Sequence, residues 1–128
     1  MIVGLDHVQL AMPPGKENAV RTYCIEVLGL AEVDKPASLA GRGGAWFGLG
    51  DEWQIHYGVE AAFQPNRKAH PAFVVNDLDG LAARLAAAGY PVNWDEALAP
   101  RRRFYSSDPF GNRLEFMERS EEGKAYEG

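Results

Sequence analysis

Three histidines and one glutamate are the residues of this chain whose placement points to chemistry. His7, His56 and His70 are the only histidines among the 128 residues. His7 and His70 begin two similar segments, residues 7–12 and 70–75, while His56 and Glu115 hold matching places in residues 54–57 and 113–116. The separations within the two pairs are also alike: 49 residues separate His7 from His56, and 45 separate His70 from Glu115. Because imidazole and carboxylate groups bind divalent metals, the matched set predicts a metal site.

The elements that position these residues form an internal repeat. Alternating polarity predicts strands over residues 2–12, 53–59, 70–75 and 112–118, with each candidate ligand on the phase opposite the apolar one. Helices are predicted over residues 16–28 and 78–88, followed by Gly29 and Gly89, and Asp77 suits the N-cap of the second helix. Shorter strands are predicted at 31–33, 45–49, 90–93 and 103–107, and the Asp108-Pro109-Phe110-Gly111 segment predicts a turn.

The order strand, helix and three strands therefore occurs twice, which predicts an α+β fold of two tandem βαβββ modules. The modules cover about residues 2–60 and 68–118 of a single domain spanning residues 1–128. Two modules facing each other would form a cup-shaped mixed sheet with the helices outside and the candidate ligands inside. Residues 119–128 are polar and charged, which is typical of a mobile tail.

The composition excludes several classes of function. A net charge of −5 and a pI near 5.1 argue against nucleic acid or an anionic membrane surface as a partner. No apolar run approaches the roughly 18 residues of a membrane span. The single cysteine, Cys24, permits no intrachain disulfide, which suits a reducing cytoplasm. We therefore expect a cytoplasmic protein with a small-molecule partner.

Three segments of the chain resemble the vicinal oxygen chelate superfamily, which includes glyoxalase I, extradiol dioxygenases, fosfomycin-resistance thiol transferases, methylmalonyl-CoA epimerase and bleomycin-resistance proteins. They are Leu5-Asp6-His7-Val8, Val27-Leu28-Gly29-Leu30 and Asp108-Pro109-Phe110-Gly111-Asn112-Arg113-Leu114-Glu115-Phe116. The resemblance implies metal ligands on the first and last strand of each module, which by position are His7, His56, His70 and Glu115. The chain departs from glyoxalases at His56, a position where the resemblance implies a Glu or Gln and where a glutamate takes part in moving the substrate proton.

The predicted function is a divalent-metal-dependent enzyme that chelates two neighbouring oxygens of a small substrate, in a glyoxalase-like lyase or a dioxygenase-like reaction. The nitrogen-rich donor set favours Zn, Ni, Fe or Mn. Glu115 and His56 are the candidate catalytic groups, and His56 is either a fourth ligand or a hydrogen-bonding partner of water or substrate. Candidate substrate-binding residues are Gln9, Trp46, Gln54, Arg103, Tyr105 and Arg113.

Two other interpretations stay open. The chain is also compatible with a metal-free small-molecule-binding protein of the bleomycin-resistance type, or with a structural member that keeps the ligands without turnover. Each module leaves an exposed sheet edge, so the sequence favours a homodimer. The ligand set is compatible with a site within one chain or across two.

Overall fold

A computed structural model of the protein describes residues 1–50 and 53–119. The chain divides into two compact units, the first ending at Pro65 and the second beginning at Asn66. Each unit has the order strand, helix and three strands, with one mixed four-stranded sheet. The predicted α+β class and the two-module organisation are therefore confirmed.

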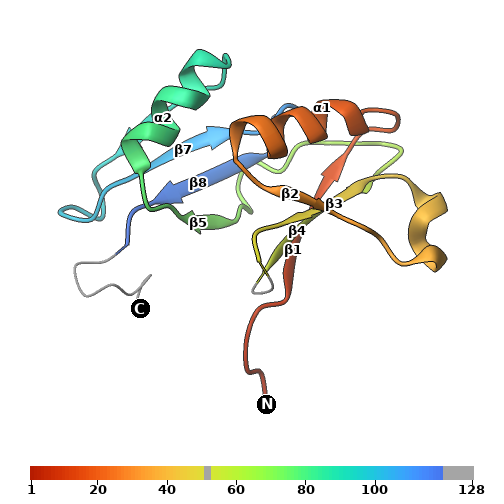
Figure 1. The fold of residues 1–128 in the computed structure, drawn as a ribbon. Helices are drawn as coiled ribbons and strands as arrows, with labels where there is room; N and C mark the ends of the chain where they lie inside the picture. Colours follow the sequence, from red (N-terminus) through yellow and green to blue (C-terminus); the bar gives the residue numbers. More distant parts are fainter. Residues whose placement is uncertain (51–52, 120–128) are drawn as a thin grey trace. The chain divides into compact units, whose positions relative to one another are not determined.

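The first unit is built on a sheet with the strand order β1-β4-β3-β2 (Figure 1). β1 and β4 are parallel, and the other neighbouring pairs are antiparallel. The elements of this unit are β1 (His7–Met12), α1 (Glu17–Arg21), the π-helix η1 (Thr22–Val27), β2 (Ala31–Val33), the 3-10 helix η2 (Ala37–Arg42), β3 (Ala45–Gly48) and β4 (Gln54–Val59). Its largest fully buried side chains are Met12, Val20, Tyr23, Cys24, Phe47 and Tyr57.

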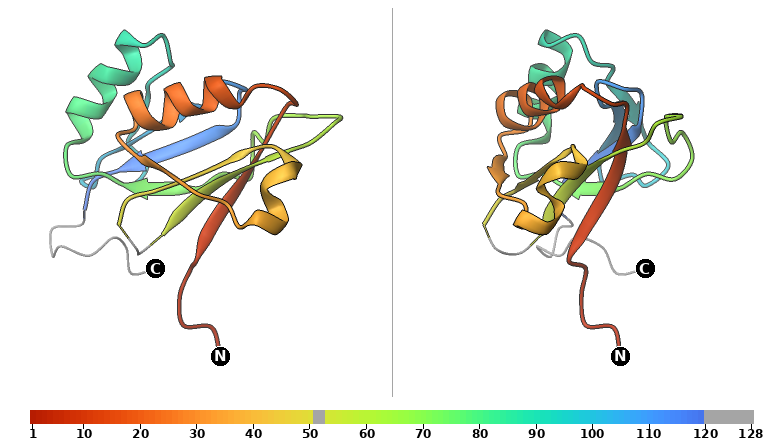
Figure 2. Two further views of the ribbon diagram at one scale, coloured as in Figure 1. Left: turned by 45° about the vertical axis from the view of Figure 1, so that its right-hand side comes forward. Right: turned by 90° about the vertical axis from the view of Figure 1, so that its right-hand side faces the viewer.

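Two boundaries in the first unit differ from the prediction. The strand predicted over residues 2–12 begins only at His7, because the pairing with β4 starts at the His7–Gln54 pair. Residues 1–6 are exposed and extend away from the sheet of their own unit (Figure 2). The helix predicted over residues 16–28 has nearly the expected extent, but its second half is the π-helix η1, in which the backbone N–H of Leu28 donates to the carbonyl of Tyr23. The 3-10 helix η2 lies in a region predicted as loop.

The second unit has the strand order β5-β8-β7-β6, with β5 parallel to β8. Its elements are β5 (Ala72–Val74), α2 (Leu78–Ala87), β6 (Asn93–Asp95), β7 (Arg103–Ser107) and β8 (Arg113–Met117). α2 lies along one face of β7 and β8 (Figure 1), and its leucines 78, 81 and 85 are buried. As predicted, the Asp77 side chain caps α2 by accepting a hydrogen bond from the backbone N–H of Gly80 at 3.0 Å.

The predicted bounds 90–93 of the next strand are wrong, since the observed strand β6 covers Asn93–Asp95. Pro91 has no N–H to donate, and the pairing with β7 begins at the Asn93–Tyr105 pair. β5 is also shorter than predicted, so His70 lies two residues before the strand. Residues 120–128 of the predicted tail lie outside the described residues.

The predicted turn before β8 is held by a buried network of side chains. The Asp108 carboxylate accepts hydrogen bonds from the backbone N–H groups of Phe110 and Asn112, both at 2.9 Å, and from Nδ2 of Asn112 at 2.8 Å. Oδ1 of Asn112 accepts a hydrogen bond from the backbone N–H of Asn66 at 3.0 Å. The Asn66 carbonyl in turn accepts from the N–H of Arg113 at 2.8 Å. The network therefore fixes residues 66–67 beside the first residue of β8.

The described helices are short, and the longest of them, α2, has ten residues. In residues 1–50 and 53–119, no helix has the length and apolarity that crossing a membrane requires.

Candidate functional site

One face of the first sheet carries all five predicted site residues of that unit. In the parallel pairing of β1 and β4, His7 lies opposite Gln54, and Gln9 lies opposite His56. The antiparallel pairing of β3 and β4 places Trp46 opposite His56. Because directly paired residues point to the same side of a sheet, the five side chains share one face. The alternation in the sequence therefore assigned His7, Gln9, Gln54 and His56 to the correct face, and the strand pairing adds Trp46.

His56 is packed between two aromatic rings on this face. Its ring stacks on that of Trp46 at a centroid distance of 3.8 Å and on that of His7 at 4.0 Å. The residue is only 5 % exposed. Burial lowers the pKa of His56 below its usual value, the neighbouring His7 lowers it further, and Asp6 partly opposes this. His56 is therefore held as a neutral imidazole.

A neutral His56 has one N–H, and the Gln54 side chain determines its position. Nε2 of His56 lies 2.7 Å from Oε1 of Gln54, an amide oxygen that can only accept, so Nε2 donates. Nδ1 then carries the lone pair. If His56 binds a metal or accepts a proton in this tautomer, it does so through Nδ1.

In His7, Nε2 rather than Nδ1 is the nitrogen available to a ligand. Nδ1 of His7 donates to the carboxylate oxygen Oδ1 of Asp6 at 2.8 Å. Nε2 has no hydrogen-bond partner within residues 1–50 and 53–119, and the side chain is 40 % exposed. A carboxylate on one imidazole nitrogen orients the ring and makes the second nitrogen a better metal ligand. His7 therefore has the local environment of a metal-binding histidine.

His70 and Glu115 form the corresponding pair in the second unit. Nδ1 of His70 donates to the backbone carbonyl of Lys68 at 2.8 Å, and Nε2 lies 2.9 Å from Oε1 of Glu115. Both nitrogens of His70 thus face oxygen atoms, whereas a neutral imidazole has a single N–H to donate. A neutral His70 with its N–H on Nδ1 therefore presents the lone pair of Nε2 to Oε1 of Glu115, and a metal cation could be held by these two atoms.

Glu115 is held from its other side by Arg103. Glu115 is 6 % exposed, and its Oε2 accepts a hydrogen bond from Nη1 of Arg103 at 3.0 Å. Nη2 of Arg103 donates to Asp95 at 3.3 Å. The hydrogen bond from the N–H of Ala97 holds the pKa of Asp95 below its usual range, against a smaller opposing effect of burial, and Arg103 lowers it further. Arg103, predicted to bind substrate, thus bridges two carboxylates and orients Glu115.

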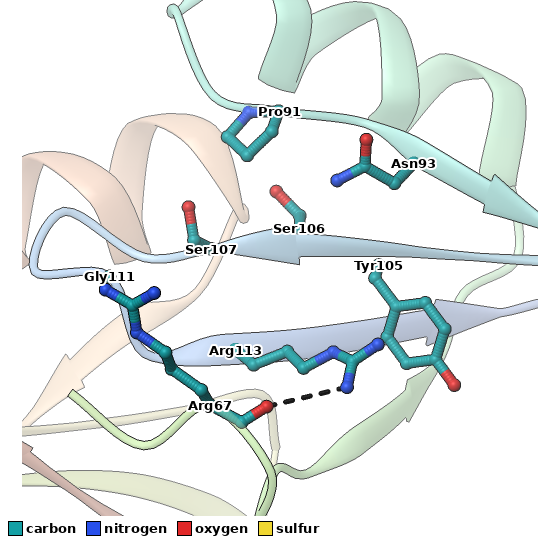
Figure 3. A pocket seen from close by; sticks show the side chains of 8 residues that line it. All are labelled: Arg67, Pro91, Asn93, Tyr105, Ser106, Ser107, Gly111 and Arg113. Carbon is teal, nitrogen blue, oxygen red and sulfur yellow. Dashed lines mark hydrogen bonds between the residues drawn. The ribbon is translucent and has the colours of Figure 1, made fainter.

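Tyr105 and Arg113 lie beside this pair. Tyr105 is directly opposite Glu115 in the β7–β8 pairing, and the His70 ring approaches the Tyr105 ring edge-on at 5.5 Å. The guanidinium carbon of Arg113 lies 3.9 Å from the centroid of the Tyr105 ring, within the range of a cation–π contact. Next to them is an open hollow of about 330 Å³, bordered by Arg67, Asn93, Tyr105, Ser106, Ser107 and Arg113 (Figure 3).

The structure brings the predicted residues together in two groups, one in each unit. Each unit contributes two of the four predicted ligands, His7 and His56 from the first and His70 and Glu115 from the second. Over residues 1–50 and 53–119, no group of three or more His, Cys, Asp or Glu side chains is placed to hold a metal ion. The proposed ligand set therefore depends on side chains of both units.

Several residues of these groups were not predicted from the sequence. Asp6 orients His7, and its position next to His7 in the chain was an available signal. Asp95 and Arg67 carried no such signal, since they lie 8 and 46 residues from their respective partners Arg103 and Arg113 in the sequence. Their importance depends on strand pairing.

Comparisons with known proteins identify the class to which this fold and these groups belong. No protein-family model matches the chain, and no curated protein does either. Among solved structures, a glyoxalase family protein from Bacillus anthracis is 47 % identical, with 92 % of this chain and 96 % of that chain covered and a TM-score of 0.87. The chain therefore belongs to the glyoxalase family of the vicinal oxygen chelate superfamily.

More distant structures share the fold. A variant of the fosfomycin resistance protein FosX from Listeria monocytogenes, complexed with Mn(II) and 1S,2S-dihydroxypropylphosphonic acid, is 20 % identical, with 96 % of this chain and 97 % of that chain covered and a TM-score of 0.75. Lactoylglutathione lyase from Agrobacterium tumefaciens is 18 % identical, with 91 % and 94 % covered and a TM-score of 0.71.

Proposed function

We propose that this protein is a divalent-metal-dependent enzyme that binds a small oxygenated substrate through two neighbouring oxygens. The proposed ligands are His7, His70 and Glu115, and His56 is either a fourth ligand or a hydrogen-bonding partner of water or substrate. The observation that carries the proposal is the orientation of the His7 and His70 rings. Each donates from Nδ1 to an oxygen of its own segment, which directs Nε2 toward a ligand.

The residues present fit a metal of the Zn, Ni, Fe or Mn group. Nitrogen donors outnumber the single carboxylate, and hard oxygen-preferring cations such as Mg and Ca favour the opposite composition. The Mn(II) in the FosX complex supports a metal of this group in a related fold. When bound, such an ion would polarise the substrate oxygens and stabilise negative charge that develops on them.

Glu115 and His56 are the proposed catalytic groups, in a lyase reaction like that of glyoxalases or in a dioxygenase-like reaction. Oε2 of Glu115 is held by Arg103, so Oε1, which faces Nε2 of His70, is the oxygen that would bind the metal or take a proton. His56 is neutral at neutral pH because of its lowered pKa, and its Nδ1 lone pair can accept a proton. Gln54 fixes that tautomer and is therefore a positioning residue.

Metal content tests the proposal. The purified full-length protein is expected to hold one divalent ion per proposed site by elemental analysis, and His7→Ala or Glu115→Ala should abolish that stoichiometric metal. Glu60→Ala, at an exposed position outside both groups, is the matched control. Full metal retention in His7→Ala or Glu115→Ala would contradict the proposed ligands. A wild-type protein without metal that still binds small molecules would instead support a metal-free binding protein of the bleomycin-resistance type.

We further propose that the protein is a cytoplasmic homodimer. The first sheet ends at β1 and β2 and the second at β5 and β6, and each such edge has backbone groups that can pair with a second copy. Light scattering coupled to gel filtration is expected to give twice the mass of one 14.1 kDa chain. A monomeric mass would contradict the homodimer.

A further inference from the structure

The hollow at the start of β8 combines two arginines with no acidic residue. Arg67 and Arg113 both border it (Figure 3), and none of its described lining residues is Asp or Glu. Arg21, Arg102 and Arg103 each pair with a carboxylate elsewhere in the structure. In contrast, neither Arg67 nor Arg113 forms an ion pair within residues 1–50 and 53–119. Two guanidinium groups therefore face one hollow without a counter-charge in direct contact.

Both arginines are held in place by their backbone. The turn network ties Asn66 to Asn112 and to the first residue of β8, so that Arg67 starts beside Arg113. Nη1 of Arg113 reaches the Arg67 carbonyl at 3.5 Å, and its guanidinium lies on the Tyr105 ring. The Arg67 side chain extends away from the Arg113 guanidinium, so the two positive charges border different parts of the hollow (Figure 3).

Neutral donors border the same hollow. Ser107 lies opposite Arg113 in the β7–β8 pairing, so its hydroxyl is on the same face of the sheet as the Arg113 side chain. Asn93 lies opposite Tyr105 in the β6–β7 pairing and adds an amide group on that face. Guanidinium and hydroxyl donors together match the several acceptor oxygens of an oxyanion.

We propose that this hollow binds an oxyanionic group, namely a carboxylate, a phosphate or a phosphonate. The hollow adjoins the His70–Glu115 pair through Tyr105, which lies opposite Glu115 and in edge contact with His70. An anionic group held by Arg67 and Arg113 would therefore belong to a molecule whose remainder extends toward Glu115. The identification of that molecule as the substrate rests on the proposed function, whereas the binding of an anion by Arg67 and Arg113 is independent of it.

Titration of the full-length protein with acetate, inorganic phosphate and methylphosphonate tests the proposal and distinguishes the three chemistries. Binding is measured by calorimetry and by amide chemical shifts, on metal-stripped and on metal-loaded protein. At least one anion is expected to bind the metal-stripped protein and to shift the amides of Tyr105, Ser107 and Arg113. Arg113→Gln is expected to weaken that binding about tenfold or more, because a charge-assisted hydrogen-bonding partner is lost. Arg67→Gln should act in the same direction.

Arg84→Gln is the matched control, since it removes the same charge from an exposed position on α2 outside the hollow. The proposal is overturned if none of the three anions binds, if the shifted amides lie elsewhere, or if Arg84→Gln weakens binding as much as Arg113→Gln. If the purified wild-type protein holds no metal but still binds the anion, the proposed metal-dependent enzyme is contradicted and the anion site is still supported.

Discussion

Oε1 of Glu115 lies 2.9 Å from Nε2 of His70, a residue 45 positions earlier in the chain. The contact joins the last strand of the second unit to the segment just before its first strand, because β5 and β8 are parallel neighbours. His70 donates from Nδ1 to Lys68, and Glu115 accepts from Arg103 on its other oxygen. Each partner of the contact is therefore fixed by a second bond.

Glu115→Gln is expected to lower the stability of the protein by about 3 kcal/mol, since it leaves Arg103 and His70 without their carboxylate in a mostly buried setting. Denaturant unfolding in the absence of metal measures this loss. Asp79→Asn removes one carboxylate from an exposed ion pair with Arg102 and should cost much less. Equal losses in the two variants would contradict the structural role assigned to the Glu115 pair.

Asp6→Ala is expected to weaken metal binding about tenfold without abolishing it, because Asp6 orients the His7 ring but is not itself a proposed ligand. Competition with a chromophoric chelator measures the affinity. Asp34→Ala removes a carboxylate from another exposed position of the same unit and should leave the affinity unchanged. An unchanged affinity in Asp6→Ala would show that the hydrogen bond does not orient His7 for binding.

Titration of His56 should make stability depend on pH. The folded protein lowers the pKa of His56 below its usual 6.5, so the unfolded chain takes up this proton first. The contribution of neutral His56 to stability is complete above about pH 6.5 and is lost as the pH falls toward the lowered pKa. His56→Phe keeps an aromatic ring between His7 and Trp46 but cannot titrate.

Unfolding of the wild type and of His56→Phe, measured from pH 8 to pH 5 without metal, tests whether His56 makes stability fall as the pH falls. The wild type is expected to lose more stability than the variant below about pH 6.5. Parallel curves for the two proteins would contradict a lowered pKa.

The sequence by itself determined the repeat, the phase of each candidate residue and most local signals. Alternation placed His56 and Glu115 on the faces they occupy, and Asp77 caps α2 as predicted. These features depend on neighbours a few residues away, whose geometry is set by local backbone preferences. Residues 2–6 show the limit of such reasoning, because their alternation suggested a strand that has no paired neighbour.

Only the tertiary structure decided which side chains meet. Arg103 reaches Glu115 and Asp95 because β7 lies between β8 and β6. Arg67 lies beside Arg113 because Asn112 and Asn66 bond across 46 residues of chain. The stack of Trp46, His56 and His7 similarly requires β4 to lie between β3 and β1. Strand order and register are set by the packing of the whole sheet, so residue types and spacing could predict a metal site but not the partners that orient its ligands.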